Sequence, residues 1–241
     1  MYNYYLDFVP QDRIVKRIAY APSFGTSEWE YTLEQEKKCR ELVKLFDKVS
    51  VREDDGVRLC KEHLGVDALH VVDPTMLLHR DVYFKFVKKG DGEKYIGCNY
   101  LDFSDDKLVM VKRLSCTLNL PVRQLISMGN ISESKCTNFI APSIEEWLSG
   151  IANSEYMIVD SFHATVFCIL FHKNFITVAN VARGLSRFSS LLKMVGLEDR
   201  LITESCTDFL DIIKHPIDWS IIDKKVLNMK EKSICFIKEN L

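Results

Sequence analysis

The amino-acid sequence predicts an α/β protein built from two Rossmann-like parallel α/β units, of which the N-terminal one is incomplete. Short apolar stretches alternate with segments of helical periodicity along most of the 241 residues, a pattern typical of parallel sheets covered by helices. A polar, glycine-containing segment at residues 88–94 interrupts this alternation, which then restarts. The first expected strand already begins at Arg17, which leaves little chain for earlier elements of the first unit.

The first unit shows a β-α-β-α-β order, which predicts parallel strands joined by right-handed crossovers. Gly65 is expected to end its second helix as a C-cap. The expected strands cover residues 17–21, 49–52 and 69–72, and the expected helices cover residues 33–46 and 54–64.

The second unit repeats the alternation. Ser143 and Glu146 form the pattern of a capping box at the start of one of its helices. The expected strands cover residues 95–100, 122–128, 156–159 and 175–178, and the expected helices cover 105–118, 143–151, 165–171 and 186–195.

These elements predict three regions along the chain. Residues 1–90 form the partial N-terminal unit, residues 91–205 form the C-terminal unit, and residues 206–241 form a helical tail. Within this tail, apolar residues recur with loose helical spacing over residues 221–237.

Composition and charge exclude several classes of protein. The chain is 47% hydrophobic and 27% charged, which is ordinary for a globular protein. A net charge of −2 argues against nucleic-acid binding, which needs a concentrated basic face. No apolar run approaches the roughly 20 residues of a membrane span, and the N-terminus lacks the pattern of a signal peptide. We therefore expect a cytoplasmic protein without a transmembrane segment.

The eight cysteines are scattered singly, without a CxxC pair, so we expect reduced thiols and no disulfide framework. Cys60 and His63, and likewise Cys168 and His172, share one helical face. Both pairs lie in core-like helices of different units, so buried thiols and capping histidines are the better explanation, and we expect no metal site.

The segment after the strand at residues 156–159 carries the strongest candidate site. Ser161 is placed to cap the next helix, and His163 falls in its first turn. A helix N-terminus presents unpaired N–H groups and the positive end of a dipole, which favour an anion. The alternative is a capping serine beside a histidine that only packs.

Three further strand ends carry candidate binding residues. Arg52 follows the second strand and could hold a carboxylate or phosphate, although an ordinary ion pair with Glu53 or Asp54 explains it as well. Ser23 and Gly25 lie in the turn after the first strand, and either a ligand contact or a plain turn is possible. Arg183 and Arg187 flank the start of a helix, and the sequence does not decide which of them faces a ligand. Neither a dinucleotide fingerprint nor a P-loop is present.

Taken together, these segments resemble the polysaccharide pyruvyl transferase family. The resemblance extends in the family's order over nearly the whole chain up to Leu201. The matching stretches are residues 5–8 (YLDF), 17–25 (RIAYAPSFG), 49–53 (VSVRE), 72–75 (VDPT), 143–148 (SIEEWL), 158–167 (IVDSFHATVF) and 186–200, from SR to GLEDR.

The resemblance implies a glycosyltransferase-B-like arrangement of two Rossmann-like halves. The implied activity is transfer of a pyruvyl group from phosphoenolpyruvate to two sugar hydroxyls as a ketal, on a sugar or lipid-linked oligosaccharide acceptor and without a cofactor. The family's key histidine corresponds to His163, its strand-end arginine to Arg52, and the serine before the histidine to Ser161. Ala164 stands where many members have glycine.

The chain departs from the family pattern at its start. The usual opening strand, its Asn- or Gly-rich turn and a later Gly-Ser-Asp segment have no counterpart here. About the first third of a usual member is therefore expected to be missing. A truncated chain, or a partner chain or second copy that completes the N-terminal unit, would each account for this.

The expected mechanism follows from the donor. Phosphoenolpyruvate carries a phosphate and a carboxylate, which Arg52 from one unit and either Arg187 or the helix start at Ser161 from the other could clamp. His163 suits the proton transfers, because imidazoles titrate near neutral pH. Two alternatives stay open: a glycosyltransferase that uses a nucleotide-sugar, and a non-catalytic remnant or partner subunit.

Overall fold

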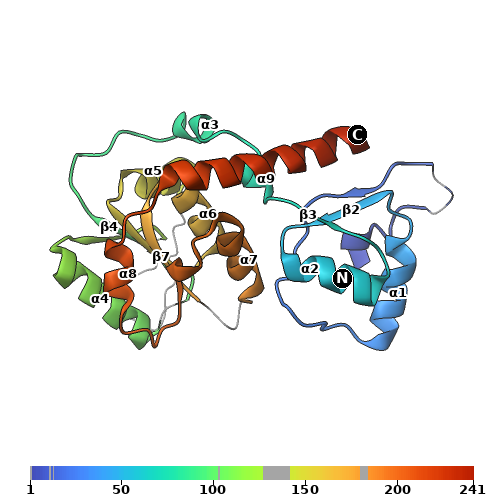
Figure 1. The fold of residues 1–241 in the computed structure, drawn as a ribbon, viewed down its shortest axis with the longest axis horizontal. Helices are drawn as coiled ribbons and strands as arrows, with labels where there is room; N and C mark the ends of the chain where they lie inside the picture. Colours follow the sequence, from blue (N-terminus) through green and yellow to red (C-terminus); the bar gives the residue numbers. More distant parts are fainter. Residues whose placement is uncertain (1, 11, 13, 103, 127–141, 180–183) are drawn as a thin grey trace. The chain divides into compact units, whose positions relative to one another are not determined.

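The computed structural model describes residues 2–10, 12, 14–102, 104–126, 142–179 and 184–241. The chain divides into two compact units (Figure 1). Unit 1 comprises Met1–Leu77, Val181–Val195 and Ile222–Leu241, and unit 2 comprises Leu78–Asn180 and Gly196–Ile221.

Unit 1 contains a three-stranded sheet in the order β1-β2-β3, and both strand pairs are parallel, as the β-α-β-α-β pattern predicts. A short π-helical turn continues the second helix, and Gly65 ends it in the left-handed conformation, with φ of 69°. The elements are η1 (Tyr2–Tyr5), β1 (Ile18–Ala19), α1 (Leu33–Val43), β2 (Lys48–Val51), α2 (Asp54–Leu59), η2 (Cys60–Leu64), β3 (Leu69–His70), η3 (Pro74–Met76), α7 (Ser186–Val195) and most of α9 (Trp219–Asn240).

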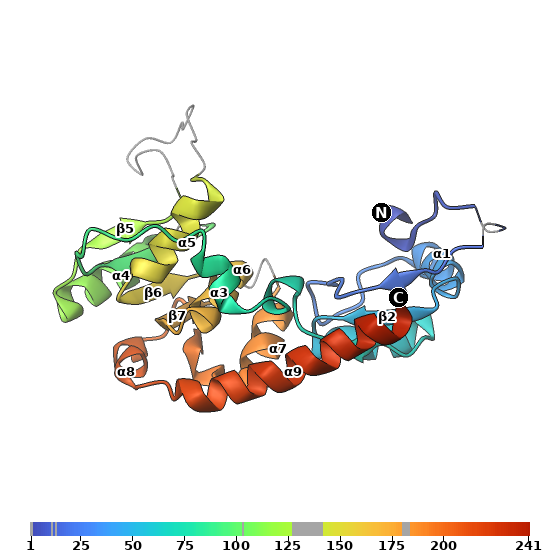
Figure 2. The ribbon, with the colours of Figure 1, turned by 90° about the horizontal axis from the view of Figure 1, so that it is seen from above.

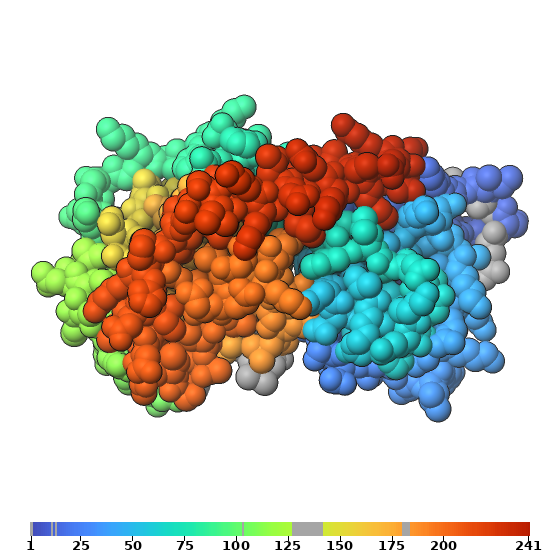
Figure 3. Space-filling view, viewed as in Figure 1, coloured from blue at the N-terminus to red at the C-terminus, as the bar shows by residue number. Residues whose placement is uncertain are grey.

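Helix α9 packs against the strands of unit 1 although it is the last element of the chain. The backbone N–H of Val72 donates to the Ser233 hydroxyl over 3.0 Å, and the rings of Tyr20 and Phe236 lie 6.3 Å apart. The other residues of α9 are mostly exposed or half-buried, and this helix forms the red band at the surface in Figure 3. Residues 222–241 of the predicted tail thus belong to unit 1, whereas residues 206–221, with α8, belong to unit 2.

Unit 2 contains a five-stranded sheet in the order β5-β4-β6-β7-β8, and all neighbouring strands are parallel. This order matches a doubly wound Rossmann-like sheet, in which the second strand lies outside the first. The elements are α3 (Arg80–Phe84), β4 (Ile96–Asn99), α4 (Asp105–Leu118), β5 (Val122–Gln124), α5 (Ile144–Asn153), β6 (Tyr156–Val159), α6 (Phe162–Leu170), β7 (Asn174–Val178), η5 (Glu198–Arg200), β8 (Leu201–Ile202) and α8 (Phe209–Lys214).

Helices cover both faces of this second sheet. On one face, Met110 and Leu114 of α4 and Phe209 of α8 join the apolar cluster of the strands. On the other face, Trp147 of α5 packs edge-on against Phe167 of α6, with ring centroids 5.2 Å apart. Figure 2 shows α5 and α8 on opposite sides of the strands. The α/β class and the two parallel sheets predicted from sequence are confirmed.

The division into regions differs from the sequence prediction of 1–90, 91–205 and 206–241. The first boundary falls at Leu77, and residues 181–195 and 222–241 belong to unit 1. Their side chains explain this grouping: the Ser186 hydroxyl donates to the Asp55 carboxylate over 2.8 Å, and the Asp54 N–H donates to the Ser190 hydroxyl over 2.9 Å. Helix α7 is therefore held to the start of α2. Part of the strand expected at 122–128, residues 127–128, lies outside the described residues.

Among the described residues, no helix has both the length and the apolar character that a membrane span requires.

Candidate functional site

The order in which strands are added to the sheet of unit 2 reverses between β4 and β6. These two strands are neighbours in space, whereas β5, which lies between them in sequence, is on the outer side of β4. In open α/β sheets, ligands bind outside the carboxyl ends of the strands at such a switch point. The residues that follow β6 are Asp160, Ser161, Phe162 and His163. The segment singled out from the sequence thus begins where the topology favours a ligand.

Ser161 and His163 form the start of α6. Ser161 is the N-cap residue, as predicted, and its hydroxyl accepts a long hydrogen bond of 3.5 Å from the N–H of Ala164. The His163 side chain is exposed in the first turn of the helix, and its ring packs edge-on against Phe162, with centroids 5.5 Å apart. The imidazole is therefore accessible at the end of the helix that favours negative charge.

A buried ion pair anchors the start of this segment. Asp160 is 1% exposed, and its carboxylate accepts hydrogen bonds from the N–H groups of Leu101 and Asp102, at 2.6 and 3.2 Å. It also accepts from the ammonium of Lys107, at 2.7 Å, and Lys107 is itself 1% exposed. These bonds tie the end of β6 to the end of β4 and to α4. This pair was not predicted from the sequence, because a lysine within an amphipathic helix normally faces water.

Asn99, at the end of β4, is a second buried polar residue near the switch point. Its side-chain oxygen accepts from the indole N–H of Trp147 over 2.7 Å. Its amide nitrogen is buried and has no hydrogen-bond partner among the described residues. Such a group is costly to leave unsatisfied.

In unit 1, Arg52 lies at the end of β2 between two buried acids. Its Nη1 donates to the Asp73 carboxylate over 2.6 Å, and its Nε lies 3.5 Å from Oε1 of Glu53. The Arg52 side chain is 18% exposed, and the two carboxylates are at most 2% exposed. The ion pair with Glu53 considered from the sequence is thus present, but it is part of a buried cluster and not an ordinary surface contact.

Glu53 was considered from the sequence only as an ion-pair partner of Arg52, and not as a candidate site residue. Its Oε1 accepts a short hydrogen bond from the Ser23 hydroxyl, and its Oε2 is buried without a partner among the described residues. Burial raises the pKa of this carboxyl, against the opposing effects of the Ser23 hydrogen bond and the charges of Arg52 and Arg187. A strand-end acid next to an arginine was visible in the sequence, but its burial was not.

Arg187 acts in unit 1 and not in the C-terminal unit to which the sequence prediction assigned it. It is the second residue of α7, and its charge contributes to the pKa of Glu53 together with that of Arg52. The sequence suggested a clamp formed by Arg52 of one unit and Arg187 of the other. Both arginines belong to unit 1 in the structure, so this pair does not join two units. The alternative candidate, Arg183, lies outside the described residues.

The backbone at Gly25 lies close to the backbone at Gly184. Both Gly25 and Gly184 adopt positive φ angles, 79° and 85°, which glycine tolerates without strain. A Cβ atom added to Gly184 would lie 1.6 Å from the Gly25 carbonyl oxygen. The loop after β1, which carries Ser23 and Gly25, is thus packed directly against the segment that leads into α7.

Replacing Gly184 by alanine is therefore expected to lower the free energy of unfolding by clearly more than about 1 kcal/mol, because strain at positive φ adds to a backbone clash. Gly92→Ala is the matched control, since Gly92 has φ of 87° and no atom within 4 Å of its added Cβ. Urea denaturation followed by circular dichroism measures both variants. Equal losses in the two would show that the approach to Gly25 has no energetic weight.

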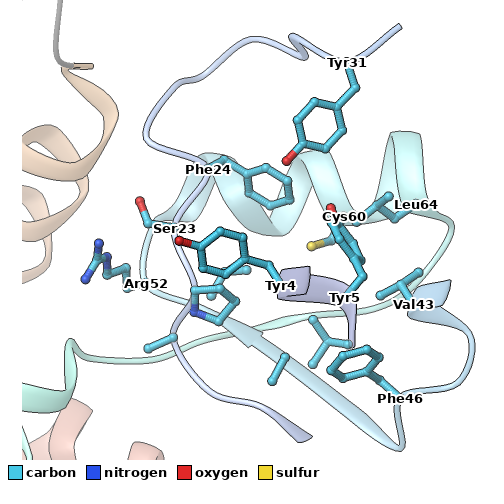
Figure 4. A pocket seen from close by; sticks show the side chains of 15 residues that line it. Tyr4, Tyr5, Ser23, Phe24, Tyr31, Val43, Phe46, Arg52, Cys60 and Leu64 are labelled. Carbon is cyan, nitrogen blue, oxygen red and sulfur yellow. The ribbon is translucent and has the colours of Figure 1, made fainter. Parts of the chain in front are cut away.

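A pocket of about 590 Å³ opens beside Ser23 and Arg52 in unit 1. Figure 4 shows these two side chains on one side of the pocket, with Leu64 and Val43 on the other. Aromatic rings supply much of the lining, which sequence reasoning did not locate because they come from separate elements. These rings are Tyr4, Tyr5, Phe24, Tyr31 and Phe46.

The structure therefore places the six candidates in two groups. Ser23, Gly25, Arg52 and Arg187 lie in unit 1, around or next to Glu53. Ser161 and His163 lie in unit 2, at the switch point of its sheet. Among the described residues, no group of three or more histidine, cysteine or acidic side chains is arranged to hold a metal ion.

The fold is that of an α/β protein with two parallel sheets. The family model of polysaccharide pyruvyl transferase matches residues 1–181, and the chain belongs to this family. This match includes every candidate residue except Arg183 and Arg187. No curated protein matches the sequence.

A solved structure described as the glycotransferase of kitacinnamycin is similar to this chain with 8% sequence identity and a TM-score of 0.48. The similarity covers 84% of this chain and 57% of that one. The chain thus spans little more than half the length of this solved protein.

Proposed function

We propose that this protein transfers a pyruvyl group from phosphoenolpyruvate to two hydroxyls of a sugar, as a cytoplasmic step in the synthesis of a surface polysaccharide. The observation that carries the proposal is the exposed imidazole of His163, in the first turn of α6 at the switch point of a doubly wound sheet. Membership of the family supports the reaction class. The acceptor would be a sugar or a lipid-linked oligosaccharide.

The anionic donor suits the cationic features of both units. Arg52 lies in the lining of the pocket of unit 1 and carries two geometrically fixed carboxylate contacts that hold its side chain in place. A guanidinium fixed in this way can meet a phosphate or carboxylate with two parallel hydrogen bonds. The start of α6, capped by Ser161, offers N–H groups and a positive dipole end. Each feature, taken by itself, can hold a phosphate or a carboxylate group.

The chemistry requires proton transfer but no redox step. A proton added to the methylene carbon forms a C–H bond with the electrons of the C=C bond, and a sugar hydroxyl attacks the neighbouring carbon and loses its proton. A second hydroxyl then forms a bond to the same carbon and loses its proton while the C–O bond to phosphate breaks, which leaves a cyclic ketal and inorganic phosphate. His163 is the residue we assign to these proton transfers, since an accessible imidazole can both accept and donate a proton near neutral pH.

The role of Arg52 is tested by Arg52→Lys, which keeps the charge and removes the planar fork. We expect the affinity for phosphoenolpyruvate to fall by roughly 10- to 100-fold, because hydrogen bonds to charged groups contribute about 1.5–3 kcal/mol and lysine cannot form the same pair of bonds. Isothermal titration calorimetry with phosphoenolpyruvate measures the affinity, and release of inorganic phosphate in the presence of candidate oligosaccharides measures turnover.

Arg58→Lys is the matched control for this test. Arg58 is an arginine of α2 that pairs with Glu62 at the surface, so its replacement is expected to leave affinity unchanged. Wild-type affinity in Arg52→Lys would contradict the assignment. Tight binding of a uridine or guanosine diphosphate, with no binding of phosphoenolpyruvate, would instead support a nucleotide-sugar glycosyltransferase.

A further inference from the structure

We propose that Glu53 couples a proton to anion binding at Arg52. In this proposal the cluster of unit 1 binds an anion well when Glu53 is protonated and poorly when it is ionised, and a bound anion in turn keeps the proton on Glu53. The inference rests on the anion-binding role proposed for Arg52. It adds a pH-dependent control of that site, which the family match does not assign.

The geometry of Glu53 is unfavourable for a permanent charge. The residue is 1% exposed, and one carboxylate oxygen, Oε2, has no hydrogen-bond partner among the described residues. The other oxygen accepts from the Ser23 hydroxyl and lies 3.5 Å from Nε of Arg52. The backbone N–H of Phe24 also favours the ionised form, but burial outweighs these contacts and raises the pKa of the carboxyl. An ionised carboxylate buried with one oxygen unsatisfied loses much of its solvation. A carboxylic acid would lose less, and its O–H could donate to an anion that arrives.

The charges of the cluster make protonation decisive. Arg52 and Arg187 supply two positive charges, and Glu53 and Asp73 supply two negative charges, so the sum is zero while both acids are ionised. Asp73 is engaged by Arg52 and by the N–H and hydroxyl of Thr75, at 3.0 and 2.7 Å, which favours its ionised form. Neutralising Glu53 alone leaves one net positive charge, which attracts an anion.

The other charged and titratable groups near Glu53 do not replace it in this role. Asp54 and Asp55, which follow it at the start of α2, are engaged by Lys193 and by Ser186. His70 on β3 contacts the Arg52 carbonyl at 3.2 Å, and burial lowers its pKa below the ordinary value, which keeps it neutral near physiological pH. In contrast, burial raises the pKa of Glu53 above that of an ordinary glutamate.

The sign of the linkage follows from these charges. As pH rises through the pKa of Glu53, the cluster loses its net positive charge, so anion affinity falls. By reciprocity, an anion bound beside Glu53 raises its pKa further, and binding takes up a proton. With one proton linked, the dissociation constant rises by up to about tenfold per pH unit.

The test uses the whole chain of 241 residues and inorganic sulfate, which stays ionised throughout the range. Calorimetric titrations at about pH 5, 6, 7 and 8 are made in two buffers of different ionisation enthalpy. We expect the wild type to bind sulfate more weakly as pH rises and to take up a proton on binding. Glu53→Gln should bind sulfate with a nearly constant affinity and without proton uptake, and at about pH 8 more tightly than the wild type. Circular dichroism confirms that each variant is folded.

Glu62→Gln is the matched control, because Glu62 is an exposed glutamate of the next turn that pairs with Arg58. It should retain the pH dependence of the wild type. The same pH dependence and proton uptake in Glu53→Gln would overturn the proposal, and so would the absence of sulfate binding to the wild type at every pH. A parallel titration with phosphoenolpyruvate separates the two proposals. Linked sulfate binding without phosphoenolpyruvate binding sinks the donor assignment alone. Phosphoenolpyruvate binding with the same proton uptake in Glu53→Gln as in the wild type sinks the role of Glu53 alone.

Discussion

Replacing His163 by glutamine is expected to slow the proposed pyruvyl transfer by about 100- to 10,000-fold, the usual contribution of a positioned general acid or base. Glutamine keeps a polar side chain of similar reach at the start of α6 but cannot exchange a proton near neutral pH. Because His163 is exposed, the change should leave the fold intact. Phosphate release from phosphoenolpyruvate in the presence of an acceptor measures the rate, and calorimetry measures the donor affinity, which should change much less than the rate.

His79→Gln provides the control for this experiment. His79 is another exposed histidine of unit 2, and it caps the short helix α3. Its replacement should leave the rate close to that of the wild type. Full turnover in a folded His163→Gln variant would remove His163 from the mechanism. An equal loss in His79→Gln would show that the effect is not specific to the switch point.

Replacing Lys107 by methionine is expected to lower the free energy of unfolding by about 3–5 kcal/mol, because it leaves the carboxylate of Asp160 buried without its cation. Asp160 would retain the two backbone N–H donors of Leu101 and Asp102, which moderates the loss but does not neutralise the charge. Urea denaturation followed by circular dichroism measures the overall effect. Hydrogen exchange of the β4 and β6 amides reports on unit 2 directly.

Two further variants make this test specific. Lys112→Met removes an exposed lysine from the same helix and should change stability by no more than about 0.5 kcal/mol. Lys107→Met combined with Asp160→Asn should recover part of the loss, since the buried charge is then absent. A loss below about 1 kcal/mol in Lys107→Met would mean that water reaches Asp160 and that the pair is not a structural anchor.

The sequence predicted most elements because their signals are local. The capping box of Ser143 and Glu146, and the glycine stop at Gly65, lie within a few residues of the helix ends that they define. Helix α4 and strand β6 have the predicted bounds. In contrast, β8 has only two residues, Leu201–Ile202, which is too short for a periodic pattern.

Candidate residues at strand ends were predictable for the same reason, whereas their partners were not. Arg52 directly follows a strand, but its contact with Asp73 joins residues that lie 21 positions apart. The pair of Lys107 and Asp160 spans 53 positions. Such pairs depend on the order of strands within a sheet, which the sequence pattern does not specify.

The division into units failed because it assumed that neighbours in sequence belong together. Helix α7 follows strands of unit 2 in the chain, yet Ser186 and Ser190 bond to the start of α2. The apolar pattern that predicts α7 as a helix does not say which partner its buried face will meet. Arg187 was therefore placed in the wrong unit together with its helix.

The discontinuous path of the chain sets an order of events during synthesis. Val72 leaves the ribosome 161 residues before Ser233, whose hydroxyl accepts a hydrogen bond from the Val72 N–H. At roughly 5–20 residues per second, the two are separated by about 10 to 30 seconds. During this interval unit 2 is made, and the strands of unit 1 lack at first both α7 and α9, and then α9 alone. The sheet of unit 1 can therefore reach its final packing only after Ser233 has been translated, much later than its own three strands.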